Sequence, residues 1–218
     1  MCGKFAAKSS WREVTNVLDA MNGAPRAEDE DRDVGYRVMS ALPVIVWDVA
    51  QQRRRIVAMR WGFPARTDPR RPDPIHVRAE TIDERPTFRD AFLAGQRGIV
   101  LAKNFNEAPD SGEQHTITPG DDSVIGIAFL WRRFGDLIAC VMATVPANDL
   151  IAGLPTDRMP AILAPEDWAI WLGEEEADLT QVKACLKTAA GADWRMSREQ
   201  RAAKSRRKPT MMDPGGLF

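Results

Sequence analysis

The feature that most constrains the fold of this chain is a series of short apolar runs rich in isoleucine, valine and alanine. Each run is shorter than a typical helix, and turn-forming residues such as glycine, proline and aspartate lie between the runs. The runs are 43–47, 56–61, 99–102, 124–129 and 137–145. They predict strands, and the lack of a regular strand–helix alternation disfavours a doubly wound parallel sheet. We therefore expect an α+β fold with a largely antiparallel, barrel-like β-sheet and a few flanking helices.

Helical patterns are confined to a few segments. Residues 10–13 fit a capping box for a helix that ends near residue 21. Thr87 with Asp90 offers a cap for a short helix that carries Phe88 and Phe92 on one face. Loops are expected at 22–35, 64–74 and 112–122, where glycine, proline and acidic residues gather.

Two more helices are expected towards the end of the chain. Pro165 suits the first turn of one helix and Gly173 suits its end, while apolar residues recur at helical spacing over 179–189. From Arg195 to Lys208 the chain is basic with few apolar residues. We therefore expect one domain over residues 1–194 and a basic, flexible tail over 195–218.

The composition is that of a soluble protein. Of 218 residues, 44% are apolar and 28% are charged, and no apolar run approaches the roughly 18 residues that a membrane-spanning helix needs. The first residues have no apolar segment typical of a signal peptide. We expect a cytoplasmic protein that does not bind membranes, acts as a monomer and needs no metal or other cofactor.

Charge is strongly segregated, although the net charge is only −1. Residues 53–71 contain seven arginines and a single acid, Asp68. This stretch is interpreted either as a solvated basic face or as a surface that follows nucleic acid phosphates.

The three cysteines form no CxxC pair and indicate no disulfide framework. Cys140 lies in an apolar strand-like run and Cys185 lies on the apolar spacing of an expected helix, so both are interpreted as structural. Cys2 differs, because removal of Met1 would make it the first residue.

Five short motifs occur in order along the chain: 1–5 (MCGKF), 59–64 (MRWGFP), 76–81 (HVRAET), 105–108 (FNEA) and 156–163 (TDRMPAIL). Together they resemble the SOS response-associated peptidase (SRAP) family, over residues 1 to about 172. This resemblance implies attachment to abasic sites in single-stranded DNA through an N-terminal cysteine.

The resemblance implies a catalytic set of Cys2, Glu107, His76 and Thr156. Cys2 and Glu107 match the family, whereas His76 stands where the family has asparagine and Thr156 where it has histidine. Either His76 supplies the missing imidazole, or it only fills the space of the asparagine. Lys4 replaces the usual arginine and keeps its charge.

The resemblance also implies that Arg78 and Arg158 hold phosphates beside the lesion. Trp61, Phe63 and Pro64, next to the basic stretch, are interpreted as a stacking wedge for neighbouring bases. The expected DNA-binding residues are Lys4, Arg60, Trp61, Phe63, Pro64, Arg78 and Arg158.

An N-terminal cysteine explains why the first motif must stand at the start of the chain. Its α-amine can condense with the aldehyde of an opened abasic sugar, and its thiol can then close a five-membered thiazolidine ring. An internal cysteine has no free amine and cannot do this. Two other functions stay open: a related single-stranded DNA binder that does not cross-link, and an N-terminal-nucleophile hydrolase or peptidase.

Overall fold

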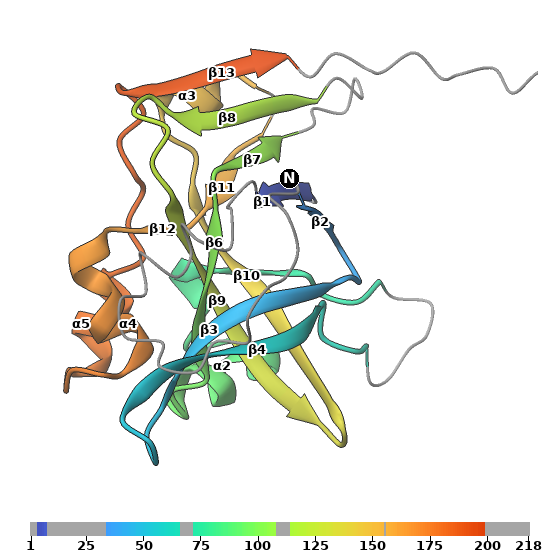
Figure 1. The fold of residues 1–218 in the computed structure, drawn as a ribbon, viewed down its shortest axis with the longest axis vertical. Coiled ribbons are helices and arrows are strands. Elements are labelled where there is room, and N and C mark those ends of the chain that lie inside the picture. The colour runs from blue at the N-terminus through green and yellow to red at the C-terminus, as the bar shows by residue number, and fades with distance from the viewer. Residues whose placement is uncertain (1–3, 8–33, 66–71, 108–113, 155, 199–218) are drawn as a thin grey trace, which may run out of the picture.

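The fold is a small closed barrel with a second sheet stacked at one end, seen in a computed structural model (Figure 1). The structure describes residues 4–7, 34–65, 72–107, 114–154 and 156–198. The strands of the barrel and of its extensions are β3 (Ala41–Asp48), β4 (Arg53–Trp61), β5 (His76–Arg78), β6 (Arg97–Ala102), β9 (Ile125–Phe134), β10 (Leu137–Pro146), β11 (Arg158–Pro160) and β12 (Ile162–Leu163).

The barrel closes because β9 pairs with β10 at the end of the order β10-β4-β3-β6-β9. The pairings within the ring are antiparallel, except that β4 runs parallel to β10. β5 and β11 extend the sheet at β10, and β12 extends it at β9. The predicted largely antiparallel, barrel-like α+β fold is confirmed, with these parallel pairings as a local exception.

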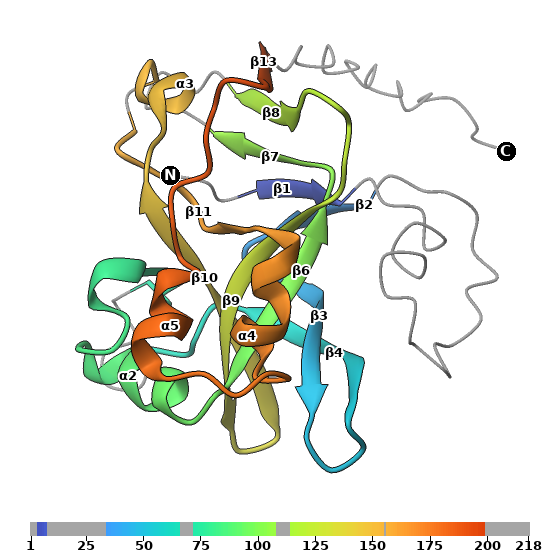
Figure 2. The same ribbon diagram turned by 90° about the vertical axis from the view of Figure 1, so that its left-hand side faces the viewer.

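The second sheet is antiparallel throughout and has the order β13-β8-β7-β1-β2. Its strands are β1 (Lys4–Ala7), β2 (Val34–Arg37), β7 (Asn104–Glu107), β8 (His115–Pro119) and β13 (Trp194–Arg198). Figure 2 shows it stacked above the barrel, with β6 leading up into β7. The chain therefore passes from the barrel into this sheet through a single residue, Lys103, which lies between Ala102 and Asn104.

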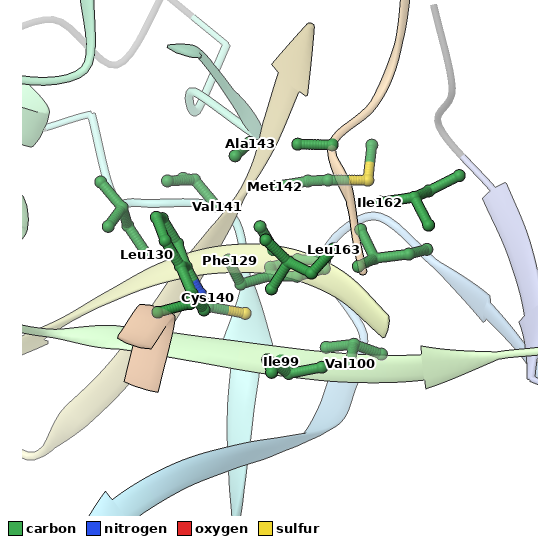
Figure 3. Close-up of a cluster of buried hydrophobic side chains, with 14 of the residues drawn as sticks. Ile99, Val100, Phe129, Leu130, Cys140, Val141, Met142, Ala143, Ile162 and Leu163 are labelled. Carbon is green, nitrogen blue, oxygen red and sulfur yellow. The ribbon is translucent and has the colours of Figure 1, made fainter. Parts of the chain in front are cut away.

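The core is centred on the barrel, where β6, β9, β10 and β12 contribute runs of consecutive buried residues (Figure 3). Ile99, Phe129 and Val141 are fully buried there. Gly126 lets Trp168 pack directly on β9, because a Cβ at this position would lie 2.7 Å from the indole ring. Burial of such large apolar surfaces is the main source of stability.

Short helices α2 (Pro86–Leu93), α4 (Trp168–Leu172) and α5 (Leu179–Ala184) lie on the outside of the barrel, with 3-10 turns at Ala79–Thr81 and Pro165–Asp167. The short helix α3 (Asp149–Ala152) lies instead at the end of the molecule that carries the second sheet (Figures 1 and 2). Gly173 ends α4 in the left-handed conformation with φ of 84°, as the sequence predicted. Within the described residues, no helix combines the length and the apolar character that a membrane crossing requires.

Several local predictions need correction. Residues 112–122 were expected to form a loop, but β8 lies within them and pairs with β7 and β13. The helix at residue 86 begins with Pro86 in its first turn, and no side chain caps it, so the predicted Thr87–Asp90 cap is wrong. The helix expected over 179–189 ends at Ala184.

The ends of the chain also differ from the prediction. β2 begins at Val34, inside the expected loop 22–35, and the predicted helix over residues 10–21 lies outside the described residues. β13 pairs along its whole length with β8, so the sheet continues to Arg198, past the expected domain boundary at 194. The proposed tail from residue 199 onward lies outside the described residues.

Candidate functional site

The second sheet brings the first described residues of the chain beside Glu107. In the register of β1 on β7, Lys4 lies opposite Asn106 and Phe5 lies opposite Phe105. Because the strands are antiparallel, the start of β1 lies next to the end of β7, where Glu107 stands. Cys2 itself lies outside the described residues.

Glu107 is a carboxylate set at the end of an apolar face. Its residue is only 1% exposed, and Phe105, two positions earlier on the same face of β7, is fully buried. Phe105 lies opposite Ile117 of β8 and its ring packs against Trp194, with 5.9 Å between the ring centroids. A carboxyl group shielded from bulk water in this way is suited to proton transfer rather than to a solvated surface.

His76 and Arg78 are placed by β5, which pairs in parallel with β10. His76 lies opposite Met142, and its ring meets the edge of Trp61 with 6.3 Å between centroids. Arg78 lies opposite Thr144 and its side chain is exposed. Arg78 therefore offers an exposed cation at the end of β5, and its charge also helps to lower the pKa of the Glu80 carboxyl.

Arg158 is placed by β11 on the same strand, β10, but its side chain is buried. The guanidinium donates two hydrogen bonds to the carboxylate of Glu80, at 2.6 and 2.9 Å, and one to the carbonyl of Thr144, at 2.5 Å. Arg158 is only 8% exposed. Both terminal nitrogens of its guanidinium thus bond within the fold, while its Nε is buried without a hydrogen-bond partner in the described structure. The prediction that it holds a DNA phosphate is therefore not supported by its position.

The Glu80–Arg158 pair joins the two motifs 76–81 and 156–163 across β10. The hydrogen bonds from Arg158 lower the pKa of the Glu80 carboxyl below its ordinary value, against the opposing effect of partial burial. The pair is therefore charged at neutral pH. In the described structure it links β11 to the 3-10 turn Ala79–Thr81 that follows β5.

Thr156 stands at the beginning of the second of these motifs. It is half-buried, and its hydroxyl donates to the carbonyl of Arg158 at 3.2 Å. A threonine hydroxyl does not exchange protons as an acid or base near neutral pH. The position thus shapes the turn before β11 and does not replace the chemistry of an imidazole.

The expected stacking wedge is wrong for its two aromatic residues. Trp61 is 0% exposed and Phe63 is 1% exposed, and the indole nitrogen of Trp61 donates to the carbonyl of Ile75 at 3.0 Å. Phe63 packs on Phe134 with 5.2 Å between ring centroids. Stacking on a base requires an exposed ring face, so both residues belong to the core, and only Pro64 remains partly accessible.

Arg60 fixes the base of the loop that leaves the barrel after β4. It donates to the carbonyl of Gly62 at 2.7 Å and forms an ion pair with Asp73 at 2.6 Å. The other carboxylate oxygen of Asp73 accepts from the backbone of Ala65 at 2.8 Å, and both contacts lower the pKa of Asp73. Gly62 has a φ of 120°, which favours glycine.

The basic stretch is more internally paired than its sequence suggests. Arg54 forms an ion pair with Glu174 at 2.5 Å and Arg55 forms one with Asp48 at 3.3 Å. With Arg60, at least three of the four arginines of this stretch that the structure describes form ion pairs with acidic residues; Arg66, Arg70 and Arg71 lie outside the described residues. The described part of the stretch therefore provides less free positive charge than a surface built to follow phosphates.

The structural interpretation of two cysteines is confirmed. Cys140 is 0% exposed in β10, and Cys185 is 3% exposed at the end of α5. Burial raises the pKa of both thiols above the ordinary value. Neither is a reactive thiolate at neutral pH, which leaves Cys2 as the candidate nucleophile among the cysteines.

Comparison with known proteins identifies the family of this chain. A model of the SOS response associated peptidase (SRAP) family matches residues 1–203. The chain belongs to this family. The match extends past residue 194, which agrees with the inclusion of β13 in the fold.

Individual SRAP relatives are distant in sequence. The abasic site processing protein YoqW of Bacillus subtilis is 25% identical over 199 residues, which cover 86% of this chain and 87% of YoqW. YobE, from the same organism and with the same description, is 26% identical over 198 residues, or 85% of this chain and 88% of YobE.

Solved structures show the same fold. A protein from Bordetella bronchiseptica superposes with a TM-score of 0.73 at 22% identity, covering 91% of this chain and 100% of that one. A protein from Bacteroides thetaiotaomicron superposes with a TM-score of 0.71 at 18% identity, covering 90% and 92%.

One residue of interest was missed in the sequence. His115 falls within residues 112–122, which were expected to form a loop, but it lies in β8 directly opposite Glu107. The alternation of His115, Ile117 and Pro119 on one face was the only signal of this strand in the sequence, and Ile117 is its single large apolar residue. Such a weak pattern does not separate a strand from a loop.

Proposed function

We propose that this protein captures abasic sites in single-stranded DNA through a covalent bond to Cys2, after removal of Met1. Membership of the SRAP family and the names of YoqW and YobE support the class of substrate. The observation that carries the proposal is the register of β1 on β7, in which Lys4 lies opposite the neighbour of Glu107. Two residues of chain span at most about 7 Å, so Cys2 is tethered within that distance of Lys4.

The chemistry requires both nucleophiles of an N-terminal cysteine. The amine attacks the aldehyde carbon of the opened sugar, and loss of water gives an imine. The thiol sulfur then bonds to the same carbon while its proton passes to the nitrogen, which closes a thiazolidine. The net change is one new C–N bond, one new C–S bond and one released water, so no oxidant or cofactor takes part.

Glu107 is the candidate for the proton transfers. Ring opening of the sugar and loss of water from the first adduct both need a proton to move to or from oxygen. Glu107 is buried and stands at the end of β7, opposite His115 of β8, while the three residues before it pair with β1. We expect Glu107→Gln to slow the reaction by about 10²-fold or more.

DNA binding is assigned mainly to Arg78 and Lys4. Arg78 is exposed and has no ion pair within the described residues, so it can bind a phosphate beside the lesion. Lys4 follows the reactive terminus by two residues and can contact the backbone as a point charge. Arg158 supports this region indirectly, through β11.

The test is incubation of the purified protein with single-stranded DNA that carries one abasic site, followed by denaturing electrophoresis. We expect a shifted band that resists denaturation, its absence with Cys2→Ala, and only a transient imine with Cys2→Ser. DNA with a tetrahydrofuran analogue, which has no aldehyde, serves as the control for binding without reaction. A durable product with Cys2→Ser would show that the thiol is not the trap.

A second candidate function is binding of single-stranded DNA without cross-linking. It is favoured by Thr156, because this threonine cannot take the acid–base role of the histidine that the family usually has there. The two functions are distinguished in the same assay, since the binder retards both abasic and tetrahydrofuran DNA under native conditions but gives no band after denaturation. Hydrolase or peptidase activity, in which the amine of Cys2 acts as the base, would instead be detected with amide substrates.

A further inference from the structure

We infer that His115 is a second proton-transfer group of this site, acting beside Glu107 and supplying the imidazole that position 156 lacks. The inference rests on the proposed covalent function and names a residue that the sequence motifs do not contain. It starts from the pairing of β7 with β8, which lie side by side in both views of the fold (Figures 1 and 2).

The register places the two side chains on one face of the sheet. Glu107 and His115 are directly opposite each other in an antiparallel pair, and opposite residues project to the same side with Cβ atoms about 4.5–5.5 Å apart. The next pair on this face is Phe105 with Ile117, both fully buried. The imidazole and the carboxyl group therefore stand together at the border between the apolar face and the end of β1.

The state of the His115 ring also points to a functional role. Its Nδ1 atom is buried and has no hydrogen-bond partner in the described structure. Burying a polar ring nitrogen without a partner is unfavourable, and such groups are kept where water or a ligand binds. Arg198 of β13 lies directly opposite His115 on the side of β8 away from β7, and its side chain is exposed.

The other histidine is less well placed for this role. His76 lies in β5 opposite Met142 of the barrel, and its ring packs on the edge of the buried Trp61. It is therefore tied to the barrel, whereas His115 belongs to the sheet that carries Glu107 and β1. This difference favours His115 over His76 as the replacement for the histidine of the family.

The proton balance gives each group a task. When the amine has added to the aldehyde, the hydroxyl of the adduct must gain a proton to leave as water, and the nitrogen must lose one. The imidazolium of His115 donates the first proton and Glu107 accepts the second, so one acid and one base are both used in the same step. Proton exchange between them, directly or through water, restores the starting state.

The experiment measures the first-order rate of cross-linking to abasic single-stranded DNA at saturating protein. We expect His115→Ala to lower the rate about 10²-fold, while its affinity for tetrahydrofuran DNA stays within about twofold of wild type. Free imidazole should restore the rate in proportion to its concentration, which a purely structural role of His115 would not allow. Thr118→Ala, on the opposite face of β8, is the matched control and should react at the wild-type rate.

Each outcome decides between the alternatives. An unchanged rate for His115→Ala, or a loss that imidazole does not restore, would overturn the role of His115 while leaving the proposed function intact. If His115→Ala does not fold, His115→Gln keeps a polar group of similar size, and a rate equal to wild type would overturn the inference in the same way. If wild type forms no bond while it still binds the DNA, the covalent function fails and this inference fails with it.

Discussion

Replacing Arg158 with alanine tests whether this arginine holds the fold together or binds DNA. In the structure its guanidinium makes two hydrogen bonds to Glu80 and one to the carbonyl of Thr144, and Arg158 is 8% exposed. A DNA ligand would need these donors to face outward. We therefore expect the main effect of Arg158→Ala to be a lower free energy of unfolding rather than a lower affinity for DNA.

The size of this loss of stability follows from the surroundings of the two groups that accept hydrogen bonds from Arg158, the Glu80 carboxylate and the Thr144 carbonyl. The side chain of Glu80 is 48% exposed, so it is rehydrated when its partner is removed, and the loss of this pair costs about 1 kcal/mol. The carbonyl of Thr144 lies on a buried strand and loses a charged donor, which costs about 1–3 kcal/mol. The free energy of unfolding should thus fall by about 2–4 kcal/mol.

The assay is equilibrium unfolding in urea, monitored by tryptophan fluorescence, with Arg78→Ala as the matched control. Arg78 is exposed and without an ion pair in the described structure, so its replacement should change the unfolding free energy by no more than about 0.5 kcal/mol. If Arg158→Ala leaves the stability unchanged and lowers DNA affinity in a salt-dependent way, the assignment of Arg158 to the fold is wrong.

Three further predictions use the same measurements. Arg78→Ala should weaken binding to single-stranded DNA and reduce the slope of log affinity against log salt by about 0.7; an unchanged slope would remove Arg78 from the DNA site. Because the pKa of Glu80 is lowered in the fold, its ion pair stabilises at neutral pH and this contribution is lost as the pH falls through that lowered pKa. The stability difference between wild type and Glu80→Gln should therefore be larger at pH 7 than at pH 3, and an equal difference at both would contradict it. Gly126→Ala would bring a Cβ within 2.7 Å of Trp168 and should cost about 1–3 kcal/mol, whereas Gly153→Ala, whose Cβ would meet only a carbonyl at 3.6 Å, should be nearly neutral.

The strands of the barrel could be predicted because nearly all of their apolar runs lie within the observed strands. The runs 43–47, 56–61, 99–102, 124–129 and 137–145 all lie within strands, apart from Val124 just before β9. Their isoleucine, valine and alanine side chains fill the core, so the hydrophobic pattern and the fold carry the same information. What the runs could not supply is the closure of the ring, because strand order depends on pairing between distant segments.

The second sheet was harder to predict because its strands are short and are held more by backbone pairing than by large apolar side chains. β8 has the sequence HTITP and β13 has WRMSR, and β13 is mostly exposed. Polar residues of this kind also occur in loops and tails, which is how both segments were interpreted. Each of these strands forms because a neighbouring strand pairs with it, and the sequence of the segment alone does not show which strand that is.

The same limit explains the errors at the site, where residue type suggested a role that burial then excluded. Tryptophan, phenylalanine and arginine beside a basic stretch fit a DNA surface as well as they fit a core, and only the position of the side chain distinguishes the two. Trp61 and Phe63 prove to be core residues, and Arg158 is an internal partner of Glu80. Conversely, His115 gained its interest only from its position opposite Glu107. If His115 does carry the proton that the family normally moves with a histidine at position 156, this SRAP protein has kept the chemistry while moving the imidazole from the barrel side of the site to the sheet that carries the glutamate.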